Sequence, residues 1–466
     1  MWLLIKGGRV LDPAQGRDFL ADVLINRAQG RIVAVGPGVR NELGAESPVE
    51  TLDATGLCVA PGFIDLHTHL REPGREDEET IESGVQAAVA GGFTAVTAMP
   101  NTQPPADSAA VVEFVRRRGD ELGLARVYPV GCISKGREGR ELAPLGELAE
   151  AGARAFSDDG SPVMNARLMR LAMEYSLAVG LPLLLHEEDT NLTAEGVVNE
   201  GRSATLAGLK GMPAVAEEVL VARDLLLAAK TGARVHFCHL SSARSVEMVR
   251  QARGRGLAVT AEATPHHITL TDEAIRTYDA RVKVNPPLRT GQDAEALVAG
   301  LADGTIGAIA TDHAPHTQEE KEREFDVAPF GMVGLETAFA VAYTRLVRGG
   351  SGKSADGTGV DGRGAGGKRG EGAEGAGSGE TPRLTLLQLV DRLSTGPARI
   401  LGVPGGRLAA GDPADITLFD PEATVRVDAA RFRSRSRNTP FDGWELRGQI
   451  VATLVGGRVV YRTERP

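Results

Sequence analysis

Short apolar runs interrupted by Gly, Asp and Pro make up the first 58 residues of the chain, and the same pattern recurs after Gly402. The first group includes LLIKGGRVLD, GRIVAVG and LCVAPG, and the second includes GRLAAGDPADITLFD and GQIVATLVGGRVVY. Runs of this length between turn-forming residues are typical of short β-strands. We therefore expect residues 1–58 and 401–466 to form the two parts of one small β-sandwich.

Between these segments, eight apolar runs alternate with helix-like stretches. They are GFIDLHTH, FTAVTAMP, ARVYPVGC, ARAFSDD, LPLLLHEE, ARVHFCHL, LAVTAEATP and IGAIATDHAP. This alternation indicates repeated βα units and a parallel sheet. Eight such units predict an α/β fold with a (β/α)8 TIM-type barrel over residues 59–400, whose chemistry lies at the C-terminal ends of the strands.

One segment of the barrel region differs in composition. Roughly two in five of residues 349–382 are glycine, and almost none of the others could enter a hydrophobic core. We expect a disordered surface insertion there. Its mixed charges and lack of aromatic residues argue against a nucleic-acid-binding tail.

Two histidines end the first of the eight runs. His67 and His69 are separated by one residue, and side chains alternate across a strand, so both imidazoles point to the same side. Such a pair can bind one metal ion. Alone it is weak evidence, because any half-buried strand can carry two polar residues on one face.

Four further runs end in a residue type that binds metals: Asp159, His186, His239 and Asp312. Each has an ordinary alternative, because a histidine at a strand end is often only hydrogen-bonded and an aspartate there often caps the next helix. Together with the first pair they supply four imidazoles and two carboxylates. This set suits two divalent ions, most simply Zn²⁺, with one carboxylate bridging them. We assign His236, His266, His267 and His313 to no metal.

Composition limits the choice of partners and compartment. The net charge is −10, and no basic stripe suggests a nucleic-acid surface. Cys58, Cys132 and Cys238 lie far apart, which fits a reducing cytoplasm rather than a disulfide framework. No signal peptide and no apolar stretch of about 18 residues is present. We expect a cytoplasmic protein with a small-molecule substrate and no membrane contact; homo-oligomerisation stays open.

The motifs GFIDLHTHLREPG, TAMPNT, AFSDDG, LLLHEED, CHLSS, VNPPLR, TDHAPH and PFGMVGLET occur in this order along the chain. This set resembles the class I bacterial dihydroorotases of the amidohydrolase superfamily, from the N-terminal strands to the closing GDPADITLFDP. The resemblance implies a barrel with a composite β-sandwich. It also implies one metal on His67, His69 and Asp312, a second on His186 and His239, and a bridging Asp159.

The bridging position separates related families. Hydantoinases and allantoinases use a carboxylated lysine on the fourth strand, and this chain has no lysine between Lys135 and Lys210. The run ARAFSDD offers Asp158 and Asp159, whose side chains face opposite sides of a strand. The residues alone leave the choice open; the resemblance favours Asp159 as the bridge, with Asp158 structural. Lys135 is the weaker alternative.

The resemblance also implies a set of substrate contacts. Arg71, Asn101 and His316 would hold a substrate carboxylate, which a guanidinium binds well. Asn285, Phe330 and Gly331 would touch the substrate ring. Taken singly, Arg71 could equally be a surface ion-pair residue, and the two asparagines could be turn residues.

The implied activity is the reversible cyclisation of N-carbamoyl-L-aspartate to L-dihydroorotate and water, a step of pyrimidine biosynthesis. Two metal ions would activate a water molecule, and Asp312 would act as general acid and base. One alternative is another cyclic amidohydrolase, such as a hydantoinase, dihydropyrimidinase or allantoinase. A second is a non-catalytic scaffold for aspartate transcarbamoylase, which would be expected to have lost metal ligands.

Overall fold

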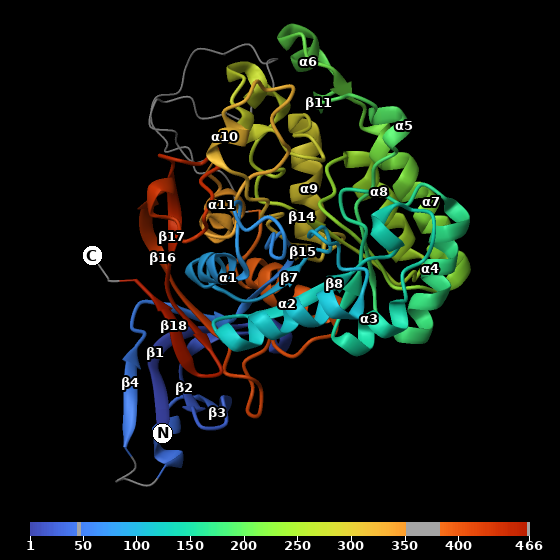
Figure 1. The fold of residues 1–466 in the computed structure, drawn as a ribbon. Coiled ribbons are helices and arrows are strands. Elements are labelled where there is room, and N and C mark those ends of the chain that lie inside the picture. The colour runs from blue at the N-terminus through green and yellow to red at the C-terminus, as the bar shows by residue number, and fades with distance from the viewer. Residues whose placement is uncertain (44–47, 351–382, 464–466) are drawn as a thin grey trace, which may run out of the picture.

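A computed structural model describes residues 1–43, 48–350 and 383–463. Its centre is a parallel sheet (Figure 1). The strand order in this sheet is β15-β14-β13-β10-β9-β8-β7-β6. The strands are β6 (Phe63–Thr68), β7 (Phe93–Ala98), β8 (Arg126–Gly131), β9 (Ala155–Phe156), β10 (Leu183–Leu185), β13 (Val235–Phe237), β14 (Val259–Ala263) and β15 (Ala308–Ile309). Each lies within one of the eight predicted runs, because strands covered on both faces need continuous apolar sequence.

The first and last strands meet and close the barrel. Thr68 forms a parallel bridge with His313, and the backbone N–H of His69 donates to the carbonyl of His313 at 2.9 Å. The same seam between β6 and β15 contains a third contact, because the carboxylate of Asp65 accepts a hydrogen bond from the Thr311 N–H at 3.0 Å. The prediction of a TIM-type barrel is confirmed.

Helices surround the barrel strands (Figure 1). They are α1 (Ile81–Ala90), α2 (Ala109–Leu122), α3 (Leu145–Ala151), α4 (Ala166–Val179), α7 (Val215–Thr231), α8 (Ala243–Gly254), α9 (Gly291–Asp303), α11 (Ala338–Leu346), α12 (Leu386–Val390), the π-helical η6 (Asp391–Thr395) and α13 (Gly396–Leu401). In α2 the buried residues Val112, Val115 and Gly119 recur at the spacing of one helical face. None of the helices in the described ranges is long and apolar enough to cross a membrane.

Shorter elements lie in the loops between strands and helices. They are η3 (Lys135–Arg137), α5 (Thr190–Thr193), β11 (Val198–Asn199), α6 (Arg202–Ala207), β12 (Gly211–Met212), η4 (Asp272–Thr277), η5 (Ala280–Val282) and α10 (Gln318–Lys321). A separate apolar cluster that includes Val198, Leu288, Phe325 and Met332 packs some of these segments against one another. The loops that follow the barrel strands are therefore supported by a core of their own.

The two ends of the chain share one sheet beside the barrel (Figure 1). Its strands are β1 (Trp2–Asp12), β2 (Arg17–Asn26), β3 (Arg31–Gly36), β4 (Val49–Asp53), β5 (Cys58–Pro61), β16 (Ile416–Arg426), β17 (Glu445–Val455) and β18 (Arg458–Arg462), with η1 (Pro13–Gln15), η2 (Val39–Glu42) and η7 (Ala429–Arg431) between them. The two segments join where β5 pairs antiparallel with β16. Residues from both, such as Val23, Val59, Ile416 and Leu454, form a second core.

The small sheet differs from the expectation in two details. Its eight strands are hydrogen-bonded into a single sheet, because β5 pairs with both β1 and β16. It also extends to Pro61, past the boundary predicted at residue 58. The glycine-rich insertion predicted at residues 349–382 lies almost wholly outside the described residues, which stop at 350 and resume at 383.

Candidate metal centre and active site

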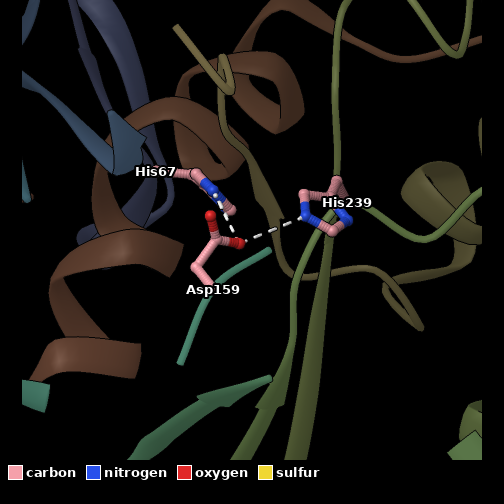
Figure 2. A group of neighbouring side chains, drawn as sticks. All are labelled: His67, Asp159 and His239. Atoms are coloured by element: carbon pink, nitrogen blue, oxygen red, sulfur yellow. Dashed lines mark ion pairs between the residues drawn. The ribbon is translucent and has the colours of Figure 1, made fainter. Parts of the chain in front are cut away.

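All six predicted metal ligands lie at the C-terminal ends of barrel strands. His67 is in β6 and His69 follows it; the others follow β9, β10, β13 and β15. They are buried. Figure 2 shows His67, Asp159 and His239, three residues at or beyond the ends of three different strands, with the carboxylate of Asp159 between the two imidazoles. The barrel therefore brings together side chains that are far apart in the sequence.

Asp159 lies at the centre of this cluster. Its Oδ1 is 3.3 Å from Nε2 of His67, 3.7 Å from Nδ1 of His186 and 3.7 Å from Nε2 of His239. Its Oδ2 is 3.6 Å from Nε2 of His69. One carboxylate thus faces all four imidazoles, as a bridge between two cation positions would.

Asp312 completes the cluster on the side of the barrel seam. Its Oδ1 is 3.2 Å from Nε2 of His69 and 3.5 Å from Nε2 of His67. Ligand atoms of His67, His69 and Asp312 lie within 4.8 Å of one another, and so do those of His67, Asp159 and His239. The cluster therefore contains two overlapping groups that could each hold a cation.

The electrostatics of the cluster fit a divalent metal. Nε2 of His67 and Oδ1 of Asp159 are buried without a hydrogen-bond partner, which is costly unless a ligand satisfies them. Burial opposes ionisation of Asp159, but His67 and His239 hold the pKa of its carboxyl well below the usual range. Conversely, burial disfavours a charged His67, yet Asp159 and Asp312 raise its pKa well above normal. The cluster attracts positive charge, which a metal ion would supply.

The neighbouring carboxylate has a different role. Asp158 accepts hydrogen bonds from the backbone N–H of Ile133 at 2.8 Å and of Ser134 at 3.1 Å, and also from the Ser134 hydroxyl. Its side chain therefore anchors the loop after β8 and faces away from the histidines. The alternative bridge, Lys135, has a half-exposed side chain that pairs with Glu141 at 2.5 Å.

Three residues fix the orientation of the imidazoles. Glu262 accepts from Nδ1 of His67 at 3.2 Å, Asn101 accepts from Nδ1 of His69 at 2.8 Å, and Glu188 lies 3.1 Å from Nε2 of His186. In each case the other ring nitrogen faces the cluster. Glu262 and Glu188 were not predicted from the sequence. The one available signal was a charged residue inside the apolar run LAVTAEATP.

The histidines assigned to no metal have other partners. His236 lies between Thr260 at 2.8 Å and Glu262 at 2.9 Å. His267 contacts the carbonyl of Pro286 at 2.9 Å, and His313 contacts Glu79 at 3.2 Å. The fourth, His266, lies against the ring of His267.

Arg71 and His316 meet beside the cluster, where both contact Glu78. Arg71 has a side chain only 11% exposed, and its Nε lies 3.0 Å from Oε2 of Glu78. Nδ1 of His316 lies 2.8 Å from Oε1 of the same carboxylate, and the Arg71 guanidinium is 3.4 Å from Nε2 of His316. Glu78 is buried and was not predicted. A single carboxylate therefore orients two of the predicted substrate contacts.

The remaining predicted contacts lie on two loops. Asn285 donates its amide N–H to Glu188 at 2.8 Å, which links it to His186. The carbonyl of Phe330 accepts from Nε2 of His316 at 2.7 Å. Gly331 has a φ of +127°, and a Cβ atom there would lie 2.6 Å from Cβ of Ala314. Only glycine fits at this position.

Backbone strain is concentrated at this site. Within the described ranges, six residues other than glycine have a positive φ, and three of them are Arg71 (60°), His239 (29°) and Asp312 (49°). Conformations of this kind are disfavoured for side chains with a Cβ and persist where the surrounding structure enforces them. The strand ends are thus bent so that these side chains turn towards the cluster.

Comparisons with known proteins agree with this geometry. A family model described as "Dihydro-orotase-like" matches residues 56–245, and one described as "Amidohydrolase family" matches residues 362–461. A dihydroorotase of Pelotomaculum thermopropionicum is 52% identical over 99% of this chain and 98% of its own length. One of Pelobacter propionicus is 47% identical over 99% of this chain and all of its own length.

Solved structures share the fold at low identity. The L-hydantoinase (dihydropyrimidinase) of Arthrobacter aurescens has a TM-score of 0.80 and 24% identity, covering 99% of this chain and 96% of its own. The dihydropyrimidinase of Brevibacillus agri has a TM-score of 0.79 and 22% identity, covering 99% and 95%. Barrel, His/Asp cluster, family models and full-length relatives together define a hydrolase of the amidohydrolase superfamily that acts on cyclic amides. Its full-length relatives at about half identity show that the chain belongs to the dihydroorotase family.

Proposed function

We propose that this chain interconverts N-carbamoyl-L-aspartate and L-dihydroorotate in pyrimidine biosynthesis, using two divalent metal ions. The observation that carries the proposal is the position of Asp159, whose Oδ1 lies 3.3 to 3.7 Å from three imidazoles. A carboxylate so placed can bridge two cations. The dihydroorotases that match over their full length support the same reaction.

His67, His69 and Asp312 would hold one ion and His186 and His239 the other, with Asp159 between them; we propose zinc because of the imidazole-rich donor set. When bound, such ions lower the pKa of water towards neutrality and polarise a carbonyl group. The unpartnered Nε2 of His67 and Oδ1 of Asp159 support this assignment.

Asp312 is the proposed general acid and base. Burial alone would favour its protonated form, but His67 and His69 hold the pKa of its carboxyl below the usual range. It is therefore a carboxylate at neutral pH and can accept the proton of the attacking water. In ring opening it would pass that proton to the leaving ring nitrogen, and in ring closure it would take the proton from the ureido nitrogen.

Arg71, His316 and Asn101 are proposed to bind the substrate carboxylate. Glu78 binds Nε of Arg71, and one terminal nitrogen of the guanidinium lies 3.4 Å from Nε2 of His316, so the two side chains could contact the same carboxylate. Because Oδ1 of Asn101 accepts from His69, its amide NH₂ is the group that would donate to the substrate. Asn285, Phe330 and Gly331 would contact the ring.

Two alternatives remain testable. A hydantoinase-type amidohydrolase is disfavoured by the Asp158–Asp159 pair where those enzymes carry a carboxylated lysine. A non-catalytic scaffold for aspartate transcarbamoylase is disfavoured because all six ligand positions are filled and buried. We propose a cytoplasmic protein, which is supported by three free buried cysteines. The proposal includes two partners of this chain, which are aspartate transcarbamoylase and further copies of the chain itself.

The test is an assay of the zinc-loaded protein in both reaction directions, with and without aspartate transcarbamoylase. Hydantoin and allantoin are the control substrates. We expect turnover of the dihydroorotate pair alone. Turnover only with the partner present would indicate that the partner completes the site. Turnover of the neutral cyclic amides would contradict the carboxylate contacts.

A further inference from the structure

Two buried lysines lie beneath the loop of residues 325–331, which carries Phe330 and Gly331. Nζ of Lys283 donates to the carbonyls of Phe325 at 2.9 Å, Asp326 at 3.0 Å and Ala328 at 2.7 Å. Nζ of Lys321 donates to the carbonyls of Pro329 at 2.8 Å and Gly331 at 3.0 Å. Five of the seven carbonyls of the loop are therefore bound by two ammonium groups.

The choice of lysine is informative in this chain. Only 8 of its 52 basic residues are lysines, yet both cations beneath this loop are lysines. An ammonium group is tetrahedral and can donate three hydrogen bonds to converging carbonyls, whereas a guanidinium donates in a planar fork. Lys283 uses all three of its N–H groups, so its contacts need the charged form of the side chain.

Burying these cations costs free energy. Lys283 is 3% exposed and Lys321 is 8% exposed, and within the described chain neither has a carboxylate within ion-pair distance. Burial lowers the pKa of Lys283 to about 8; burial and the nearby Lys283 lower that of Lys321 to about 7. Burying two cations without anions at ion-pair distance costs free energy. A gain in stability alone therefore does not account for these lysines.

The two lysines connect the loop to both neighbouring segments of the substrate site. Lys283 is two residues before Asn285, and its own carbonyl accepts from the Gly331 N–H at 2.8 Å. Its Nζ also lies 4.6 Å from the centre of the Phe330 ring, within the range of a cation–π contact. Lys321 ends α10, which begins two residues after His316.

We infer that Lys283 and Lys321 are positioning residues that hold the 325–331 loop so that Phe330 and Gly331 meet the substrate ring. This inference rests on the proposed function, because it takes those two residues as ring contacts. Without the lysines, the loop carbonyls lose their shared donors and the Phe330 ring loses its fixed place. The chemistry at Asp312 is left intact, so the defect should fall on substrate binding.

The test compares Lys283→Met and Lys321→Met with Lys230→Met, an exposed lysine at the end of α7, in the full-length protein. We expect KM for dihydroorotate to rise about 10-fold or more in the first two variants, with kcat within about 3-fold and zinc content unchanged. Lys321→Arg should restore binding, because a guanidinium can serve two carbonyls. Lys283→Arg should not restore it.

Hydrogen exchange gives a readout that is independent of activity. In the zinc-loaded Lys283→Met protein, amides of residues 325–331 should exchange at least about 10-fold faster, while the barrel strands keep the wild-type rate. Unchanged KM and loop exchange, or a loss confined to kcat, would overturn the inference. If Lys283→Met does not fold, KM and loop hydrogen exchange of Lys321→Met test the inference. An inactive wild type would refute the proposed function instead, and loop exchange would still test the lysines.

Discussion

Oε1 of Glu262 lies 3.2 Å from Nδ1 of His67, and both side chains are fully buried. The other oxygen of this carboxylate lies 2.9 Å from Nε2 of His236. Burial opposes ionisation of Glu262, but its bonds to His236 and His67 lower its pKa to about 2. An ionised Glu262 holds the proton of His67 on Nδ1, so that Nε2 presents its lone pair to the site.

Glu262→Gln should therefore weaken metal binding. We expect zinc affinity to fall about 10- to 100-fold, as is usual when a hydrogen-bond partner of a metal-binding histidine is removed, with activity partly recovered at high zinc. Titration against a zinc chelator measures this. Glu247→Gln, on the exposed surface of α8, is the control. An unchanged affinity would mean that Glu262 serves only His236.

The two neighbouring aspartates should respond differently to substitution. Asp159→Ala should lose bound metal and activity together, because its carboxylate faces four imidazoles. Asp158→Ala should keep metal but lower the melting temperature, because it leaves the N–H groups of Ile133 and Ser134 without their acceptor, at about 1–3 kcal/mol. Metal analysis and thermal unfolding measure both effects. The reverse ranking would assign the bridge to Asp158.

Asp312→Asn tests proton transfer. The amide keeps the size of the side chain but cannot accept a proton, so kcat should fall about 10²- to 10⁴-fold. The assay is run at a zinc concentration that restores the wild-type metal content. A fall of less than about 10-fold at full metal content would move the acid-base role to another group.

The Arg71–Glu78 contact predicts a selective binding defect. Arg71→Met should raise KM for dihydroorotate by at least about 10-fold, because a charge-assisted contact to the substrate carboxylate is lost. Glu78→Gln should give a smaller rise, since it disturbs only the orientation of Arg71 and His316. Arg117→Met, exposed on α2, is the control. Steady-state kinetics with dihydroorotate measure both effects, and an unchanged KM in Arg71→Met would exclude the carboxylate contact.

The cysteines should be unreactive in the folded protein. Burial raises the pKa of Cys58 to about 12 and raises those of Cys132 and Cys238 as well. An ordinary thiol has a pKa of about 8.5 and is partly ionised at pH 8, whereas the Cys58 thiol stays protonated there. A thiol reagent should thus label no cysteine at pH 8 until denaturant is added, and then all three. Rapid labelling of a native thiol would contradict this burial.

The strands of the barrel could be predicted because each is an apolar run bounded by turn residues, and this signal is local. The positions of His67, His69, Asp159 and Asp312 at strand ends follow from the same signal. The choice between Asp158 and Asp159 could not, because it depends on how the chain turns after the two-residue strand β9. That choice came from the family resemblance.

The residues that support the site were missed for a related reason. Glu262 is 195 residues from His67 in the sequence, and Glu78 is 238 residues from His316. A charged residue inside an apolar run, as at Glu262, indicates burial, but no local signal tells which distant histidine the glutamate orients. The single sheet formed by the chain ends could not be predicted either. The sequence of β5 is a short apolar run like many others, and nothing in it indicates pairing with the distant β16.

The seam between β6 and β15 has a consequence for how the protein is made. His69 and Asp312 are separated by 243 residues, and they meet only where the first strand closes against the last. During synthesis both histidines of the first strand leave the ribosome long before Asp312 is added. The complete group of His67, His69 and Asp312 cannot exist until the final βα unit has docked. Metal binding at the proposed position would therefore follow closure of the barrel, and a chain truncated before residue 312 should lack it.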